Sequence, residues 1–137
     1  MADPTDLQPR LDETPLAVAR YPAGWWPPAT VTDFAALVVA DDETTVILAE
    51  ERLDELPTPA AAERGWRRIT FPGPLPWEVV GFLADVAGRL AAARVPFTSM
   101  SGFTTDHVLV RAAQSETALA VLRGEPAPAM RPDVTNP

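Results

Sequence analysis

The clearest periodicity in the chain is helical. Between residues 76 and 93, apolar positions recur at spacings of three, four and seven residues, which places them on one face of an α-helix. Pro76 suits the first turn, because its missing N–H would have no helical partner there. The pattern predicts a helix over about residues 76–93 with a buried face made of Val79, Phe82, Leu83, Val86 and Leu90.

Runs of β-favouring residues on both sides of this helix indicate strands. Residues 66–71 predict one strand before it, and residues 95–102 and 106–111 predict a hairpin after it. A last short helix is expected from Ser115, which can cap it, and Gly124 should close it.

The first half of the chain has weaker patterns. Residues 16–21 predict a short strand that Pro22 stops, and residues 34–40 and 44–49 predict a hairpin joined by an acidic turn. Residues 50–65 are charged and rich in proline and alanine, so we expect a connector with at most one helical turn.

The order of these elements defines the fold class. A strand and a hairpin are followed by a β-α-β-β-α series, which indicates an α+β protein whose helices cover one face of an antiparallel sheet. The second half lacks the last strand of a complete βαββαβ unit, and a strand from the first half could supply it. Residues 1–12 predict a flexible arm, and residues 124–137, with four prolines, a flexible tail.

Composition excludes several classes of function. Nineteen acidic residues against eleven arginines, with no lysine, give a net charge of −8, which opposes binding to nucleic acid or to anionic lipid. The absence of cysteine excludes disulfides and thiolate metal sites. No apolar run is long enough to cross a membrane, and the first residues do not form a signal peptide. We therefore expect a cytoplasmic protein without a cofactor or a metal.

Four motifs in the second half occur in an order that resembles a known family. They are the Gly65-Trp66 strand start, the Gly73-Pro74-Leu75 loop, the segment 81–84 (GFLA) and the segment 101–110 (SGFTTDHVLV). The chain resembles the ACT-domain proteins of the CASTOR-like group, which are short bacterial chains and eukaryotic arginine sensors.

This resemblance implies a ferredoxin-like ACT fold with two ACT-like units. Residues 13–64 would form a degenerate N-terminal unit, and residues 65–123 the C-terminal unit. It also implies a non-catalytic sensor or regulator that binds an amino acid, often at an interface between units, and that forms a homodimer. The ligand would lie where the loop before the helix faces the following strand.

Elementary chemistry supports the same place for a ligand. The unpaired N–H groups and the partial positive charge of a helix start can hold a carboxylate. Asp106 could hold an ammonium group, although an aspartate at a strand start can instead cap a turn. The predicted ligand-binding residues are Gly73, Leu75, Trp77, Glu78, Val79, Ser99, Met100, Ser101, Phe103, Thr105 and Asp106.

Three alternatives stay open at this stage. The protein could be a dimerising interaction scaffold with no small ligand. It could be an enzyme if Glu78, Asp106 and His107 converge in one pocket. The paired tryptophans Trp25 and Trp26 could cover the edge of a core or form a binding platform.

Overall fold

A computed structural model describes residues 8–28, 33–73 and 80–126. Within these residues, seven strands form one sheet in the order β3-β4-β2-β5-β7-β6, and β1 lies beside β5. Every pairing is antiparallel. The strands are β1 (Arg10–Leu11), β2 (Leu16–Pro22), β3 (Ala35–Val39), β4 (Glu43–Ala49), β5 (Ala61–Phe71), β6 (Phe97–Ser101) and β7 (Asp106–Arg111). The helices are α1 (Phe82–Ala92), α2 (Ser115–Leu122) and the 3-10 helices η2 (Glu50–Glu55) and η3 (Ala112–Gln114).

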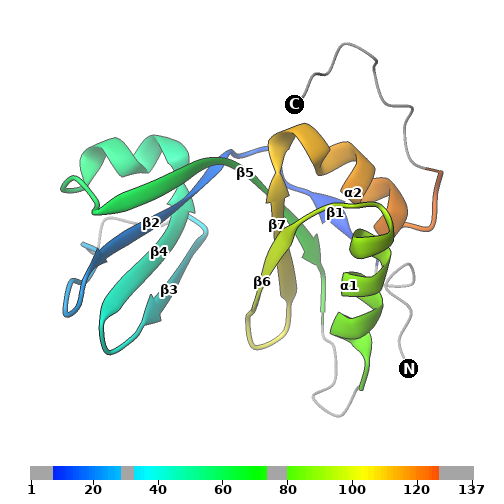
Figure 1. The fold of residues 1–137 in the computed structure, drawn as a ribbon, viewed down its shortest axis with the longest axis horizontal. Coiled ribbons are helices and arrows are strands. Elements are labelled where there is room, and N and C mark those ends of the chain that lie inside the picture. The colour runs from blue at the N-terminus through cyan, green and yellow to red at the C-terminus, as the bar shows by residue number, and fades with distance from the viewer. Residues whose placement is uncertain (1–7, 29–32, 74–79, 127–137) are drawn as a thin grey trace.

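The molecule has two lobes that share strand β5 (Figure 1). The first lobe contains β2, β3, β4 and η2, and the second contains β1, β6, β7, α1 and α2. The first part of β5 pairs with β2, from Ala61 to Trp66, and the second part pairs with β7, from Trp66 to Phe71. The boundary that we expected between residues 64 and 65 therefore falls inside a continuous strand.

The second lobe is a complete ferredoxin-like unit. Its strands run in the order β6-β7-β5-β1, so β1 fills the place of the fourth strand of a βαββαβ unit. This confirms that an earlier segment supplies the missing strand. Arg10 pairs with Thr70 and Leu11 with Ile69, so these two residues, which we expected in a flexible arm, belong to the sheet. Residues 1–7 of that arm lie outside the described part.

The predicted helix begins later than the periodicity suggested. Gly81 has φ of +91°, which an α-helix does not allow, and the helix starts at Phe82. Val80 precedes this break, and Pro76 and Val79 lie outside the described residues. The prediction that residues 80 and 81 are helical is therefore wrong. The apolar spacing continues through Gly81, but the left-handed backbone of this glycine interrupts the helix.

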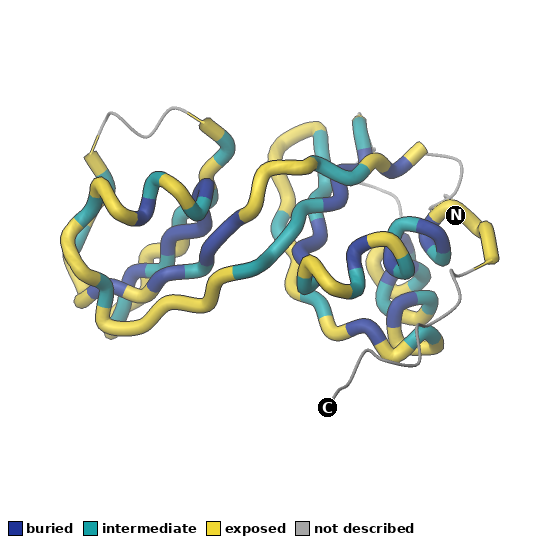
Figure 2. The backbone as a smooth tube through the Cα atoms, turned by 90° about the horizontal axis from the view of Figure 1, so that it is seen from above, coloured by how far each residue is buried: buried dark blue, intermediate teal, exposed yellow. Residues whose placement is uncertain are grey.

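Strand β5 is longer than predicted, since it begins at Ala61 rather than Trp66. Residues 61–64 are exposed (Figure 2), and they have no alternating apolar pattern that would reveal a strand. Pairing with β2 imposes the extended conformation on them, as tertiary contacts often do on sequences with weak propensity. The predicted connector is in fact η2 followed by the start of this strand.

Both α-helices cover one face of the second lobe, on the side away from the first lobe (Figure 1). Ile69, Phe71, Val108 and Val110 point from the sheet into this core, and α1 contributes its apolar face. The helix residues buried there are Phe82, Val86, Leu90, Ala118 and Leu122. This confirms the α+β arrangement that the sequence predicted.

The first lobe has its own core, built around Tyr21. The Trp25 ring stacks on the Tyr21 ring at a centroid distance of 3.7 Å, and the Tyr21 hydroxyl donates to the Pro57 carbonyl at 2.7 Å. Trp25 thus covers the edge of a core, whereas Trp26 is 67% exposed. The two tryptophans do not act as a pair.

The end of the chain is close to its prediction. Helix α2 begins at Ser115, but the Ser115 hydroxyl donates to the Ala112 carbonyl, so it does not cap the helix N–H groups. Gly124 has φ of +74° and closes the helix, as expected. Among the described residues, no helix has the length and apolar character needed to cross a bilayer.

Candidate functional site

A small cavity lies between the start of α1 and the β6–β7 hairpin. Its volume is about 60 Å³. Four predicted residues, Ser99, Met100, Ser101 and Asp106, line it, so the structure brings the hairpin part of the predicted site together. The remaining lining residues are Phe71, Phe82, Leu83, Val86, His107 and Val108.

Asp106 and Ser101 form the polar pair of this cavity. They are opposite each other in the register of the hairpin, and the Ser101 hydroxyl donates to Asp106 Oδ1 at 2.6 Å. The hairpin turn is closed separately, by the Gly102 N–H donating to the Thr105 carbonyl at 2.8 Å. Among the described residues, the Asp106 carboxylate therefore accepts a hydrogen bond from the Ser101 side chain and does not cap the turn.

The start of α1 supplies the second half of the site. Asp85 N–H already donates to the Gly81 carbonyl, so the N–H groups available at the helix start are those of Phe82, Leu83 and Ala84. A helix that starts near residue 76 would instead present the N–H groups of Trp77, Glu78 and Val79; these residues, like Leu75, lie outside the described part of the chain. The left-handed Gly81 moves the start of the helix, and only the backbone conformation reveals it.

Phe82, Leu83 and Val86 are lining residues that the sequence did not assign to the site. Their helical spacing predicts them as core residues, which is correct for Phe82 and Val86 but wrong for Leu83, which is 51% exposed. The sequence places Phe82 and Leu83 directly after Gly81, but the positive φ of Gly81, which sets the start of the helix, is visible only in the structure.

Three predicted residues do not line the cavity. Phe103 is 80% exposed at the hairpin turn. Gly73 is exposed just after β5. The Thr105 hydroxyl lies 3.0 Å from His107 Nε2, which belongs to a different cluster.

His107 borders the cavity, but its side chain points to the opposite face of the sheet from Asp106. Adjacent residues of a strand alternate between faces. His107 Nδ1 lies 3.0 Å from the Thr70 hydroxyl, and its ring meets the Phe34 ring edge-on at 5.2 Å. Phe34 comes from the first lobe, so His107 belongs to the contact between lobes. Asp106 and His107 therefore do not form the catalytic arrangement that we considered.

The half-buried position of His107 gives a pH dependence that can be tested. Burial lowers its pKa, and so does the charge of Arg68; Asp106 raises it, and Arg10 lowers it. The net result is a pKa below the ordinary value of about 6.5. Below that pH the unfolded chain binds a proton more readily than the folded one, so acid favours unfolding.

We expect the contribution of His107 to stability to be complete above about pH 6.5 and to fall as the pH drops toward its lowered pKa. Urea unfolding of the wild type and of His107→Gln between about pH 8 and 5 measures this contribution. The comparison isolates His107, because the carboxylates titrate in both proteins. The difference in unfolding free energy should shrink as the pH falls below about 6.5. Parallel curves for the two proteins would contradict the assignment.

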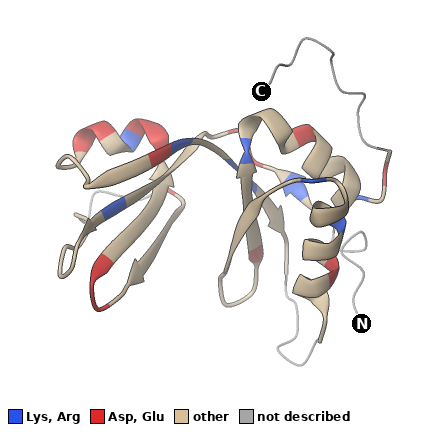
Figure 3. Cartoon of the chain, in the orientation of Figure 1, with Lys and Arg blue, Asp and Glu red and all other residues tan. Residues whose placement is uncertain are grey.

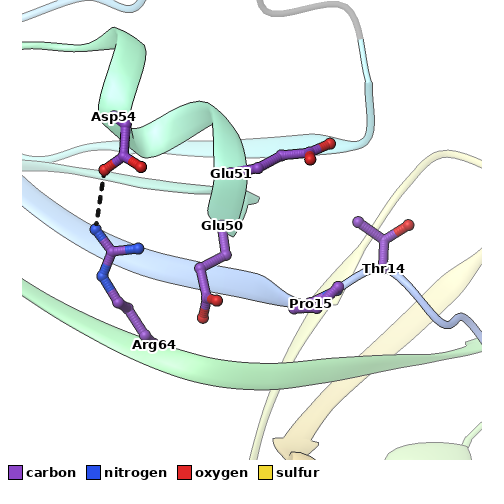
Figure 4. Close-up of a pocket in the computed structure, with 6 residues that line it drawn as sticks. All are labelled: Thr14, Pro15, Glu50, Glu51, Asp54 and Arg64. Carbon is purple, nitrogen blue, oxygen red and sulfur yellow. Dashed lines mark hydrogen bonds and ion pairs between the residues drawn. The ribbon is translucent and has the colours of Figure 1, made fainter.

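A larger hollow of about 340 Å³ lies at the side of the first lobe (Figure 4). Acidic residues gather on η2 beside it (Figure 3). The Arg64 guanidinium reaches Asp54 at 3.5 Å, and Glu50 Oε1 accepts the Gly65 N–H at 2.8 Å. Glu51 lies on the side of the hollow away from the Arg64–Asp54 pair (Figure 4). In the described ranges, no cluster of three or more His, Asp or Glu side chains is placed to hold a metal ion.

The strand order and the helices on one face define an α+β protein with a ferredoxin-like fold. A family model of the ACT domain matches residues 61–124, which contain β5, α1, β6, β7 and α2. No curated protein matches the sequence.

Solved structures share the fold over most of the chain. Atu0741 from Agobacterium tumefaciens is 25% identical with a TM-score of 0.68, and the match covers 81% of this chain and 82% of that one. VC0802 from Vibrio cholerae is 20% identical with a TM-score of 0.66, covering 85% and 86%. The regulatory subunit of aspartate kinase from Thermus thermophilus is 12% identical with a TM-score of 0.61, covering 85% and 95%.

Proposed function

We propose that this protein is a non-catalytic regulatory module that binds a free amino acid at the start of α1 and the β6–β7 hairpin. The single observation that carries the proposal is the Ser101–Asp106 pair, which lines the same cavity as the first turn of α1. ACT domains are generally regulatory modules that bind small molecules, and the matched residues 61–124 contain this whole site.

The two ends of an amino acid have complementary groups here. The N–H groups of Phe82, Leu83 and Ala84 and the positive end of the helix dipole suit the carboxylate. The Asp106 carboxylate, oriented by Ser101, suits the ammonium. A cavity of about 60 Å³ encloses only part of such a ligand, so the rest must lie outside the described cavity.

We propose that a second copy of the chain covers that remaining part. Val80 is 81% exposed and Leu83 is 51% exposed, so apolar surface lies beside the cavity entrance at the start of α1. Residues 13–64 would be a degenerate first ACT-like unit, in a cytoplasmic homodimer of the CASTOR-like kind. The strand order supports the degenerate unit, because the hairpin β3-β4 lies beside β2 in the first lobe as the hairpin β6-β7 lies beside β5 in the second.

Thermal-shift titration with each of the twenty amino acids tests this function. We expect one or a few to stabilise the protein saturably, and Asp106→Asn to weaken that binding about 10- to 100-fold, because a charged hydrogen-bonded partner is lost. Ser101→Ala should weaken it less. Asp41→Asn, in the exposed β3–β4 turn, is the matched control and should bind as the wild type does. Equal binding by Asp106→Asn would exclude this site.

The second candidate is a dimerising scaffold, which the apolar edge strand β3 favours. Val38 and Val39 are each 57% exposed there, and an unpaired edge can add a strand from another chain. Sedimentation equilibrium separates the two functions. The scaffold function would be favoured if the protein is a dimer that Val38→Lys disrupts and if no amino acid stabilises it.

A further inference from the structure

A second pocket, of about 400 Å³, lies between the two lobes. It is enclosed by the β1–β2 connection, the segment just before β3, the junction of β4 with η2, and β5. Its size is within the range of about 300–1,000 Å³ that is usual for small-molecule sites. It lies on the face of the sheet opposite to α1, so it is separate from the Ser101–Asp106 cavity.

Arg68 supplies the positive charge of this pocket. Its side chain is only 17% exposed, and its guanidinium carbon lies 3.9 Å from the centre of the Phe34 ring. Nη2 donates to Asp12 Oδ2 at 2.7 Å. The other guanidinium nitrogens have no hydrogen-bond partner among the described residues. A guanidinium held over a ring in this way still offers in-plane N–H groups to a carboxylate.

Asp12 does not cancel this capacity. Burial raises the pKa of Asp12, but the Thr14 N–H and the Arg68 guanidinium outweigh burial and hold the pKa below its ordinary value. Asp12 therefore stays ionised and fixes the orientation of Arg68 from one side. The donors on the other nitrogens are left for a ligand.

Negative charge also lines this pocket. Glu51, from η2, lines it together with Thr14 and Asp33. Asp33 Oδ2 accepts from Arg52 Nε at 3.0 Å, whereas Glu51 has no hydrogen bond or ion pair with any described residue. Glu51 and Thr14 also lie on the same side of the neighbouring hollow, which shares both residues (Figure 4). An ammonium group there would meet a carboxylate and a hydroxyl.

We propose that this interlobe pocket is a second ligand site, which binds a small zwitterion. The ligand carboxylate pairs with Arg68, and its ammonium with Glu51 and Thr14. The Phe34 ring covers one face of the guanidinium, so the N–H groups, which lie in the guanidinium plane, stay directed toward the ligand. Because Phe34 belongs to the first lobe and Arg68 to the second, an occupied pocket ties the two lobes together.

The test uses the full chain and the nitrogen–proton correlation spectrum of its arginine side chains. Arg68→Lys identifies the Arg68 Nε–H signal by its loss. Each of the twenty amino acids is added at millimolar concentration, and the N-acetyl derivative and the amide of any that binds are then compared. We expect a saturable shift of the Arg68 signal and weaker binding, by about tenfold or more, for both derivatives.

Variants separate this pocket from the site at α1. Glu51→Gln removes the charge of an exposed side chain and should weaken binding about tenfold, whereas Glu116→Gln, on α2, should leave it unchanged. Asp106→Asn should leave the Arg68 shift unchanged, so failure of the proposed function at α1 does not affect this test.

Three results would overturn the proposal. The first is an Arg68 signal that none of the amino acids shifts. The second is binding that Asp106→Asn abolishes while Glu51→Gln and Arg68→Lys leave it intact, which would place the ligand only at α1. The third is an equal shift with acetate alone, which would make the pocket an anion site without recognition of an ammonium.

Discussion

Replacing Phe71 with alanine is expected to lower the free energy of unfolding by about 3–5 kcal/mol, the usual cost of removing a large aromatic side chain from a core. Phe71 is 1% exposed at the end of β5, and its ring meets the Phe82 ring edge-on at 5.1 Å. The cavity left behind would lie between the sheet and the first turn of α1, so Phe82 would lose its ring contact with β5. Urea unfolding measures the change.

Phe103→Ala is the matched control, because the same side chain is removed where it is 80% exposed. Its effect should stay within about 0.5 kcal/mol. A cost below about 1 kcal/mol for Phe71→Ala would mean that the α1 face does not pack on β5 as described.

Gly65→Ala is expected to destabilise the protein by about 1–2 kcal/mol, the cost of a left-handed conformation for a residue with a side chain. Gly65 has φ of +81° within β5, where pairing passes from β2 to β7. No atom lies within 4 Å of an added Cβ, so the penalty comes from the backbone alone. The Gly65 N–H also donates to Glu50 Oε1, so relaxation of the backbone would disturb that bond.

Gly88→Ala provides a control of opposite sign. An added Cβ at Gly88 also meets nothing within 4 Å, but Gly88 lies inside α1, where alanine is favoured by about 1 kcal/mol. The same chemical change should therefore raise stability in the helix and lower it in the strand. If both substitutions change the unfolding free energy with the same sign, the left-handed conformation at Gly65 is refuted.

The sequence predicted best what local pattern determines. Strand β7 was expected at residues 106–111 and has those bounds, because a turn precedes a short run of β-favouring apolar residues, Val108–Val110, that is buried in the sheet. The buried face of α1 was also correct for Phe82, Val86 and Leu90. Strand β1 and the first part of β5 were missed, because only pairing with distant strands makes them extended.

The candidate site was predictable where it is local. Ser99, Met100, Ser101 and Asp106 belong to one hairpin, and a hairpin fixes which residues are neighbours. The interlobe pocket was not predictable, because Asp12, Phe34, Glu51 and Arg68 come from four separate segments. Their proximity depends on how the two lobes meet, and no sequence spacing encodes that.

The position of β1 also determines how the molecule can be divided. The chain leaves the second lobe after Leu11, forms the first lobe, and returns through β5, so the first lobe is an insertion within the second. No single cut between the lobes yields two complete units, because a fragment of residues 61–124 would lack the strand that covers Ile69 and Thr70. The two lobes are therefore nested rather than placed in tandem, so the second lobe cannot be expressed with all of its strands as one continuous segment that omits the first.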